Sequence, residues 1–301
     1  MAVRVFSWCV FPLTLAASVA WALVRIERGL PPAQAILLPL LVSFAFVAVC
    51  ERVLPHQRSW LHGRGDVPVD AGLALTSGAV TNGLTPLLVA FGVAAGGWLS
   101  RQVDAPLWPR EQPLLVQTAF ALVVAELPKY WLHRLEHEWD WLWRIHATHH
   151  SARRLYWLNA ARFHPIDLAL DHVVGVGTLA LLGCGEVVLA LFGLVSAVHG
   201  VFQHANLPLR CGPLNWIFSM AELHRWHHSP DPRVANHNYG QNLIVWDVVF
   251  GTRYLPADRE PDAAVGIADM PAFPSGFLAN LAAPFRWARV RREARTPTAA
   301  A

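Results

Sequence analysis

The chain has 301 residues, of which 54% are hydrophobic and 15% are charged, and its formal net charge is +3. Because ordinary soluble domains carry about 25% charged residues, this composition argues against a soluble globular protein. The weak positive charge gives no reason to expect nucleic-acid binding. Four cysteines without close pairing argue against a disulfide framework or a thiolate metal site.

Long uncharged stretches account for the missing charge. Residues 5–24, 30–50 and 71–99 contain no Asp, Glu, Lys or Arg, and each reaches the roughly 20 apolar residues that cross a bilayer as a helix. A shorter apolar run follows at 113–125. The sequence therefore predicts an all-α integral membrane protein with about four transmembrane helices. Residues 5–24 are predicted to be an anchor rather than a signal peptide, because further spans follow.

A further apolar region extends from Val173 to Phe202 and is interrupted at Glu186. It predicts a membrane-associated helical hairpin that enters the bilayer or lies at its surface. A hairpin in the protein core is the alternative, because the first arm, 173–185, is short for a membrane span. The sequence leaves open whether 166–204 crosses the membrane.

The distribution of basic residues predicts the orientation. If the N-terminus is inside, the loop after the second span and the segment after the fourth carry most of the Lys and Arg. The opposite loops carry only Arg25, Arg28, Arg101 and Arg110. The more basic side is the cytoplasmic one. The C-terminal basic tail, 257–301, is predicted to lie near anionic headgroups and to be partly disordered over about its last fifteen residues.

Eight histidines form three clusters with helical spacing. They are His133 and His137; His146, His149 and His150; and His224, His227 and His228. Residues three and four positions apart share a face of a helix, so each cluster directs two or three imidazoles to one point. Scattered histidines would not repeat the HxxHH spacing twice. Three such turns that converge would supply enough nitrogen ligands for two metal ions.

Three kinds of metal site are compatible with imidazole ligands. A zinc hydrolase of the HExxH type needs a Glu directly after its first His, but Arg134, Ala147 and Arg225 occupy these positions. A non-enzymatic metal-binding or metal-transport membrane protein is the second kind. A transporter needs polar or ionisable groups inside spanning helices, whereas these clusters lie beyond the spans. The third kind is a redox-active pair of irons at the membrane surface, which binds O2 and oxidises an apolar substrate.

The clusters also carry a family resemblance. HRLEH at 133–137, HATHH at 146–150 and HRWHH at 224–228 resemble the three histidine boxes of the fatty acid hydroxylase / sterol desaturase superfamily. RFHP at 162–165 and QHAN at 203–206 resemble intermediate motifs of that family, and residues 238–252 resemble the segment that follows its third box. The resemblance covers about 113–256, the predicted catalytic domain, which follows the N-terminal transmembrane helices at 1–112.

The resemblance implies a membrane-embedded, non-haem di-iron monooxygenase. Such an enzyme uses O2 and two electrons to hydroxylate or desaturate a lipid, for example a sterol or a fatty acyl chain. It implies a base of transmembrane helices and a cytosolic helical cap that carries the boxes. Hydroxylation is slightly favoured, from the resemblance alone. Zinc can replace iron on purification, since histidine sites accept it readily.

The resemblance also implies a ligand set. The eight box histidines carry over as metal ligands and catalytic residues. His204 is the best additional ligand, from its place in the QHAN motif, and His199 and His164 are further candidates. Three carboxylates are expected to orient ligand imidazoles by accepting from the second ring N–H, namely Glu136, Asp140 and Asp247. For Glu136 and Asp140, a position on a solvated helix face is the alternative.

The electrons have to come from a separate protein. The chain has neither a GxGxxG dinucleotide loop nor a cysteine pattern for an iron–sulfur cluster. We therefore expect a separate electron donor, such as a cytochrome, a ferredoxin or a reductase. The basic residues Arg144, Arg153 and Arg154 are predicted either to dock an acidic donor or to contact lipid headgroups.

Overall fold

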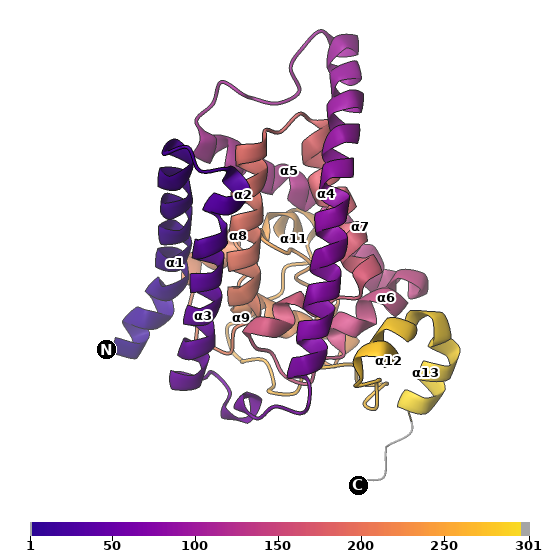
Figure 1. The fold of residues 1–301 in the computed structure, drawn as a ribbon. Helices are drawn as coiled ribbons and strands as arrows, with labels where there is room; N and C mark the ends of the chain where they lie inside the picture. Colours follow the sequence, from indigo (N-terminus) through magenta and orange to yellow (C-terminus); the bar gives the residue numbers. More distant parts are fainter. Residues whose placement is uncertain (1, 296–301) are drawn as a thin grey trace.

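The computed structural model describes residues 2–295, and these form an all-α structure (Figure 1). The longer helices are α1 (Ala2–Glu27), α3 (Leu37–Val53), α4 (Val67–Val103), α5 (Leu114–Glu138), α6 (Asp140–His150), α7 (Pro165–Leu181), α8 (Glu186–His204) and α13 (Trp287–Ala294). The shorter ones are α2 (Pro32–Ala35), α9 (Ala221–His227), α10 (Pro232–Ala235), α11 (Val245–Phe250) and α12 (Phe277–Ala282). Short 3₁₀ turns lie at Arg58–Leu61, Trp157–Ala161, Gly212–Trp216 and Pro284–Arg286. Within the described residues, the β pairing is limited to one antiparallel bridge between Phe218 and Leu243.

Four helices in the described part of the chain are long and apolar enough to cross a membrane. They comprise Val3–Glu27, Pro32–Val53, Val67–Val103 and Glu186–His204. The number agrees with the sequence prediction, but the fourth candidate is α8 and not residues 113–125. Those residues begin α5, which continues through Glu126 and Lys129 into the first histidine box. The predicted hairpin is formed by α7 and α8, and its second arm has the length and hydropathy of a span.

Helix α8 lies in the interior of the bundle, whereas α4 lies at its edge (Figure 1). The most apolar window of α8 is 61% buried, compared with 6% for that of α4. Phe11 from α1, Val47 from α3 and Phe202 from α8 belong to one core cluster. Helix α4 instead exposes large apolar side chains such as Phe91 and Val93. This is the surface expected of a helix that faces lipid.

Small residues allow α4 and α7 to pack closely. A Cβ added at Gly92 would lie 2.5 Å from the carbonyl carbon of Ala180, and one at Gly96 would lie 2.1 Å from the carbonyl oxygen of Leu181. Glycines four residues apart are a frequent device for close helix packing in membranes. The contact fixes α7, which carries Asp167 in its first turn, against the bundle.

A polar contact between distant segments lies at each end of the helix bundle. At one end, Arg154 forms a 2.5 Å ion pair with Asp66, which joins the α3–α4 segment to the segment after the second histidine box. At the other end, Arg110 of the α4–α5 segment donates to the carbonyl oxygen of Gly183, 2.6 Å away. Because Arg154 is buried in its ion pair, the exposed basic docking surface predicted from the sequence does not include it.

Part of the predicted disordered tail is helical. Helices α12 and α13 lie beside α6 (Figure 1), and Trp287 and Val290 of α13 belong to the same apolar cluster as Ala147 of α6. The sequence predicted disorder over about the last fifteen residues, but Trp287–Ala294 form a helix because Trp287, Val290 and Ala294 share one buried face. The rest of that prediction, 296–301, lies outside the described residues.

Candidate metal centre

Nine histidines converge into two adjacent groups. The first group contains His133 and His137 of α5, His146 and His150 of α6, and His227 of α9. The second contains His149 of α6, His204 of α8, and His224 and His228 at α9. Within each group, one ring nitrogen from every residue lies within 4.8 Å of the others. The rings of His150 and His228 stack across the boundary, with centroids 4.5 Å apart.

The duplicated HxxHH spacing divides the ligands between the groups. On α6, His146 and His150 are four residues apart and join the first group, whereas His149 joins the second. On α9 the division is reversed, with the pair His224 and His228 in the second group and His227 in the first. Since i and i+4 side chains lie above one another on a helix and i+3 is offset, each box reaches both groups at once.

Oxygen acceptors fix the ring orientation of four histidines in the first group. The Nδ1 partners are the Tyr239 carbonyl for His133 at 2.6 Å, the His237 carbonyl for His227 at 2.9 Å, the Asp167 carboxylate for His146 at 3.0 Å and the Asn236 amide oxygen for His137 at 3.1 Å. Each Nδ1–H donates to its oxygen, so each Nε2 keeps its lone pair. Metal-bound histidines are oriented in this way.

The second group is held by the sequence motif at 162–165. His149 Nδ1 lies 3.3 Å from the carbonyl oxygen of Arg162, and its ring stacks on Phe163 with centroids 4.2 Å apart and planes at 11°. His204 Nδ1 donates to the side-chain oxygen of Asn159 over 3.0 Å. Asn159 is itself fixed, because its amide nitrogen donates to the carbonyl of Arg154. The motif thus positions His149 through a carbonyl and a ring.

The donor set fits metal ions. The Nε2 atoms of His133 and His146 lie 3.1 Å apart, and both carry lone pairs because their Nδ1 atoms are the donors. Two facing lone pairs repel each other unless a cation lies between them. Adjacent ligands of a six-coordinate ion, each about 2.1 Å from it, lie about 3.0 Å apart. The buried Nε2 atoms of His137, His150 and His227 have no hydrogen-bond partner among the described residues, which agrees with a role as ligands.

Burial keeps these imidazoles neutral. It lowers the pKa of His133 to about 4. It also lowers the pKa values of the other seven box histidines well below the ordinary value, and neighbouring imidazoles add to the effect. A metal ligand has to be the neutral imidazole. The site is therefore ready to bind an ion at neutral pH.

A buried carboxyl pair lies behind His146. Asp167 accepts from His146 Nδ1, and a Glu136 oxygen lies 3.5 Å from the same nitrogen. Burial raises the pKa values of both groups, and the negative charge of Asp167 raises that of Glu136 further. Both groups therefore hold a proton more readily than an ordinary carboxyl group, and the pair keeps a proton close to His146.

Two of the predicted ligand candidates lie outside both groups. The ring of His164 caps α7 by accepting from the backbone nitrogen of Ile166, and its Nε2 lies 3.2 Å from the carbonyl oxygen of Leu281. His199 is fully buried, and its ring contacts Phe11 and Phe218 edge-on and stacked, respectively. Its spacing of five residues from His204 places it on another part of the helix surface.

The three predicted orienting carboxylates have different positions. Glu136 lies at His146, as described above. Asp140 instead pairs with Arg144 on the exposed start of α6. Asp247 accepts from the backbone nitrogens of Tyr239 and Gly240, both at 2.8 Å. It therefore fixes the segment whose Tyr239 carbonyl accepts from His133.

Sequence reasoning missed Asp167, Asn159 and Asn236. Asp167 lies in the first turn of α7, where an acidic residue is explained by the helix dipole alone, and its position two residues after His164-Pro165 was the available signal. Carbonyl oxygens such as that of Tyr239 leave no signal, because every residue has one.

The comparisons with known proteins agree with this site. The fatty acid hydroxylase family model matches residues 118–252. The ornithine lipid hydroxylase OlsE of Rhizobium tropici is 39% identical over 251 residues, which are 81% of this chain and 74% of that protein. The alkylglycerol monooxygenase of Danio rerio is 32% identical over 139 residues, 46% of this chain and 31% of that protein.

A more distant relative is a Delta(7)-sterol-C5(6)-desaturase of Nicotiana tabacum. It is 26% identical over 173 residues, which are 54% of each protein. No solved structure matches the chain. These relatives are lipid hydroxylases, monooxygenases and desaturases, and the family match contains all three histidine boxes. The chain therefore belongs to the fatty acid hydroxylase / sterol desaturase superfamily and is an oxidoreductase.

Proposed function

We propose that the chain is an O2-dependent di-iron monooxygenase that hydroxylates a C–H bond of a membrane lipid. The observation that carries this proposal is the pair of adjacent, buried, all-nitrogen groups of five and four histidines. Iron bound there supplies the redox chemistry that activates O2. The similarity to an ornithine lipid hydroxylase favours hydroxylation over desaturation, and it favours a polar lipid that contains an amino acid as the substrate.

The protein's own residues orient the site and hold a proton. The carbonyl oxygens of Tyr239 and His237 keep the Nε2 atoms of His133 and His227 directed at the first group. The carboxyl pair of Glu136 and Asp167, whose pKa values are raised by burial, holds a proton close to His146. Reduction of O2 consumes protons, and this carboxyl pair lies one side chain away from the ligand His146.

A cavity connects the first group with the outside. Its volume is about 460 Å3, and its lining includes His137, His150 and Trp143. The ring of Trp143 lies within 5.4 Å and 5.5 Å of the rings of these two histidines, measured between centroids. We propose that O2 and the electrons from the separate donor protein reach the metals from this side.

The positions of the basic segments in the structure support a proposal for the orientation. The α3–α4 segment, which carries Arg58 and Arg64, lies at the same end of the bundle as the histidines, through the contact of Asp66 with Arg154. The N-terminal end of α1 lies at that end as well (Figure 1). By the positive-inside rule, we propose that the metal centre faces the cytoplasm.

The test uses protein purified in detergent and loaded with iron. The proposal predicts about two irons per chain and a lipid product that contains one oxygen atom from labelled O2, formed only with a reductant. His149→Ala and His227→Ala should each remove the product and about one of the two ions, since they belong to different groups. His62→Ala, in an exposed loop, is the matched control. Product formed by both variants, or turnover without O2, would contradict the proposal.

A further inference from the structure

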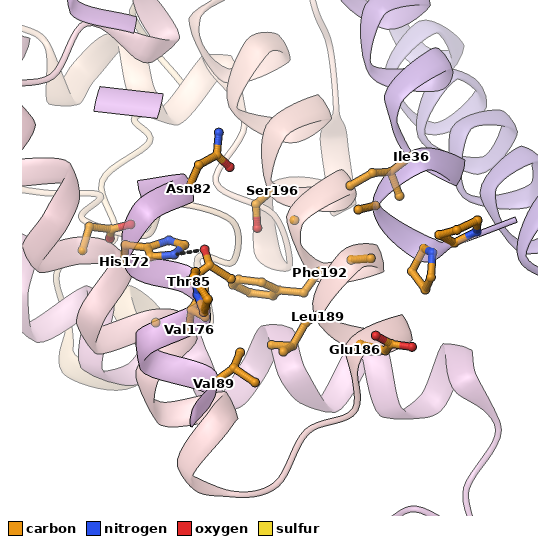
Figure 2. A pocket seen from close by; sticks show the side chains of 18 of the residues that line it. Ile36, Asn82, Thr85, Val89, His172, Val176, Glu186, Leu189, Phe192 and Ser196 are labelled. Carbon is orange, nitrogen blue, oxygen red and sulfur yellow. Dashed lines mark hydrogen bonds between the residues drawn. The ribbon is translucent and has the colours of Figure 1, made fainter. Parts of the chain in front are cut away.

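A cavity lies between α2, α4, α7 and α8, and Lys129 of α5 also lines it. Its volume is about 760 Å3. Figure 2 shows apolar side chains such as Val89, Val176 and Leu189 along it, with Asn82, Ser196 and His172 away from Glu186. The lining residues Glu186 to Ser196 on α8 correspond to a length of about 15 Å at 1.5 Å per residue. This length and lining suit an amphipathic molecule.

A buried ion pair lies at the polar end of this cavity. Lys129 Nζ is 3.1 Å from Asp171 Oδ2, and their side chains are 8% and 15% exposed. Asp171 also accepts from the side-chain amide of Gln241, 2.7 Å away. Lys129 makes this one ion pair and a contact 5.9 Å above the ring of Phe192. Because Lys129 pairs with one carboxylate, its ammonium group has further N–H donors that can bind a ligand.

The space for this lysine is created by Gly175. A Cβ at Gly175 would lie 3.1 Å from Cδ of Lys129, so the lysine stem crosses α7 where that helix has no side chain. Lys129 precedes His133 by four residues on α5, and Asp171 follows Asp167 by four on α7. Four residues of a helix rise about 6 Å. The ion pair therefore lies one helical turn from the histidines.

One buried polar group of the cavity lacks a partner within the described residues. The buried hydroxyl of Ser196 makes no hydrogen bond. Several hydroxyls on other helices donate to the carbonyl oxygen four residues earlier, as Thr178 does to Val174 over 2.6 Å, and Ser196 does not. The Asn82 amide is an exposed polar group of the same lining, at the end away from Glu186. By contrast, Thr85 and His172 bind each other over 2.8 Å, the dashed line in Figure 2.

Resting on the proposed function, we propose that this cavity binds the head of a zwitterionic lipid, with Lys129 on its oxyanion, Asp171 on its ammonium group, and Ser196 and Asn82 on its polar linkage. When a zwitterion binds, Lys129 pairs with its oxyanion and Asp171 with its ammonium group. The two charges of the ligand cancel, so binding adds no net buried charge. A ligand with a single charge leaves one buried group uncompensated, which is strongly unfavourable. The chemistry thus selects lipids that carry both charges, in an amino-acid head or a phosphoethanolamine head.

Binding of three matched amides tests the proposal without O2 or reductant. N-decanoyl ornithine has a carboxylate and an ammonium group, N-decanoyl glycine lacks the ammonium, and N-decanoyl putrescine lacks the carboxylate. Native mass spectrometry of the metal-loaded protein in nonionic detergent measures their affinities. We expect the ornithine amide to bind roughly tenfold or more tightly than the other two. Dihexanoyl phosphatidylethanolamine is the second zwitterionic probe and separates the two kinds of head.

Two variants assign the preference to the cavity. Lys129→Met with Asp171→Asn removes both charges and keeps the lysine stem and an acceptor for Gln241. It should retain both metals and bind the three amides about equally. Ser196→Ala should weaken binding of the ornithine amide roughly threefold to tenfold, and Thr178→Val, outside the cavity, should not change it.

An unchanged preference in the double variant, or equal binding of the three amides by the unaltered protein, would overturn the assignment. Turnover is measured separately, in the labelled-O2 test of the proposed function. Zwitterion binding without oxidation in that test would contradict the proposed function alone, and oxidation without the binding preference would contradict the cavity assignment alone.

Discussion

Asp167 accepts a hydrogen bond from Nδ1 of His146 over 3.0 Å, and this contact connects α7 to the first histidine group. The acceptor fixes the tautomer of the imidazole, and the carboxylate form of Asp167 makes the imidazole a stronger ligand. We expect Asp167→Asn, which keeps an acceptor and loses the charge, to lower metal affinity at the first group by roughly tenfold to a hundredfold. Competition with a chelator, read by metal content, measures the change.

The matched control is Asp262→Asn at an exposed position. It should not change the metal affinity. The melting temperature of both variants shows whether the fold is retained. Full metal affinity in Asp167→Asn would mean that the carboxylate has a structural role only.

His164 and His199 are histidines that lie outside both histidine groups, so we expect neither to bind a metal ion. Both were ligand candidates from the sequence, yet neither joins a histidine group. We expect His164→Gln and His199→Leu to retain two ions per chain. His199→Leu should change stability by no more than about 3 kcal/mol, since its ring packs among apolar side chains. Loss of one ion in either variant would reassign that residue to the metal centre.

Acid should destabilise the metal-free protein. Burial lowers the pKa of His133 to about 4 and lowers those of the other box histidines, whereas an unfolded histidine has its ordinary value of 6.5. Between about pH 4 and 6.5 the unfolded chain therefore binds more protons, and stability falls as the pH falls. Glu136 and Asp167 have the opposite sign, because their pKa values are raised.

Eight histidines outweigh two carboxyl groups below pH 6.5, and above it only the carboxyl pair contributes. The melting temperature of the metal-free protein should therefore have its maximum near pH 6.5. Differential scanning fluorimetry measures the melting temperature from pH 4 to 9, in steps of roughly one pH unit. A melting temperature that increases as the pH falls below 6 would contradict the buried, neutral state of the histidines.

Periodicity in the sequence was sufficient to predict that the histidines of each box share a helix face and that the boxes converge. The HxxHH repeats carry their own geometry, because i, i+3 and i+4 side chains share a helix face. The number of candidate spans was also predictable from uncharged length. The identity of the fourth was not, because α5 continues past its apolar run into charged and histidine-bearing turns, and α8 is enclosed by other helices.

The rest of the site depends on contacts distant in sequence. Tyr239 is 106 residues from His133, and Asn236 is 99 from His137. Their carbonyl and amide groups have no spacing signature, so only the fold reveals them. The ion pair of Lys129 and Asp171 was also not predictable, because in the sequence each residue resembles an ordinary charged residue on a helix surface. Tertiary packing brings Lys129 and Asp171 together as an ion pair close to the histidine groups.

The central claim is that two ions occupy two distinct histidine groups. Anomalous scattering from iron-loaded crystals measures this most directly. We predict two iron peaks, one enclosed by His133, His137, His146, His150 and His227, and one enclosed by His149, His204, His224 and His228. A single peak, or iron bound away from these nitrogens, would contradict the account.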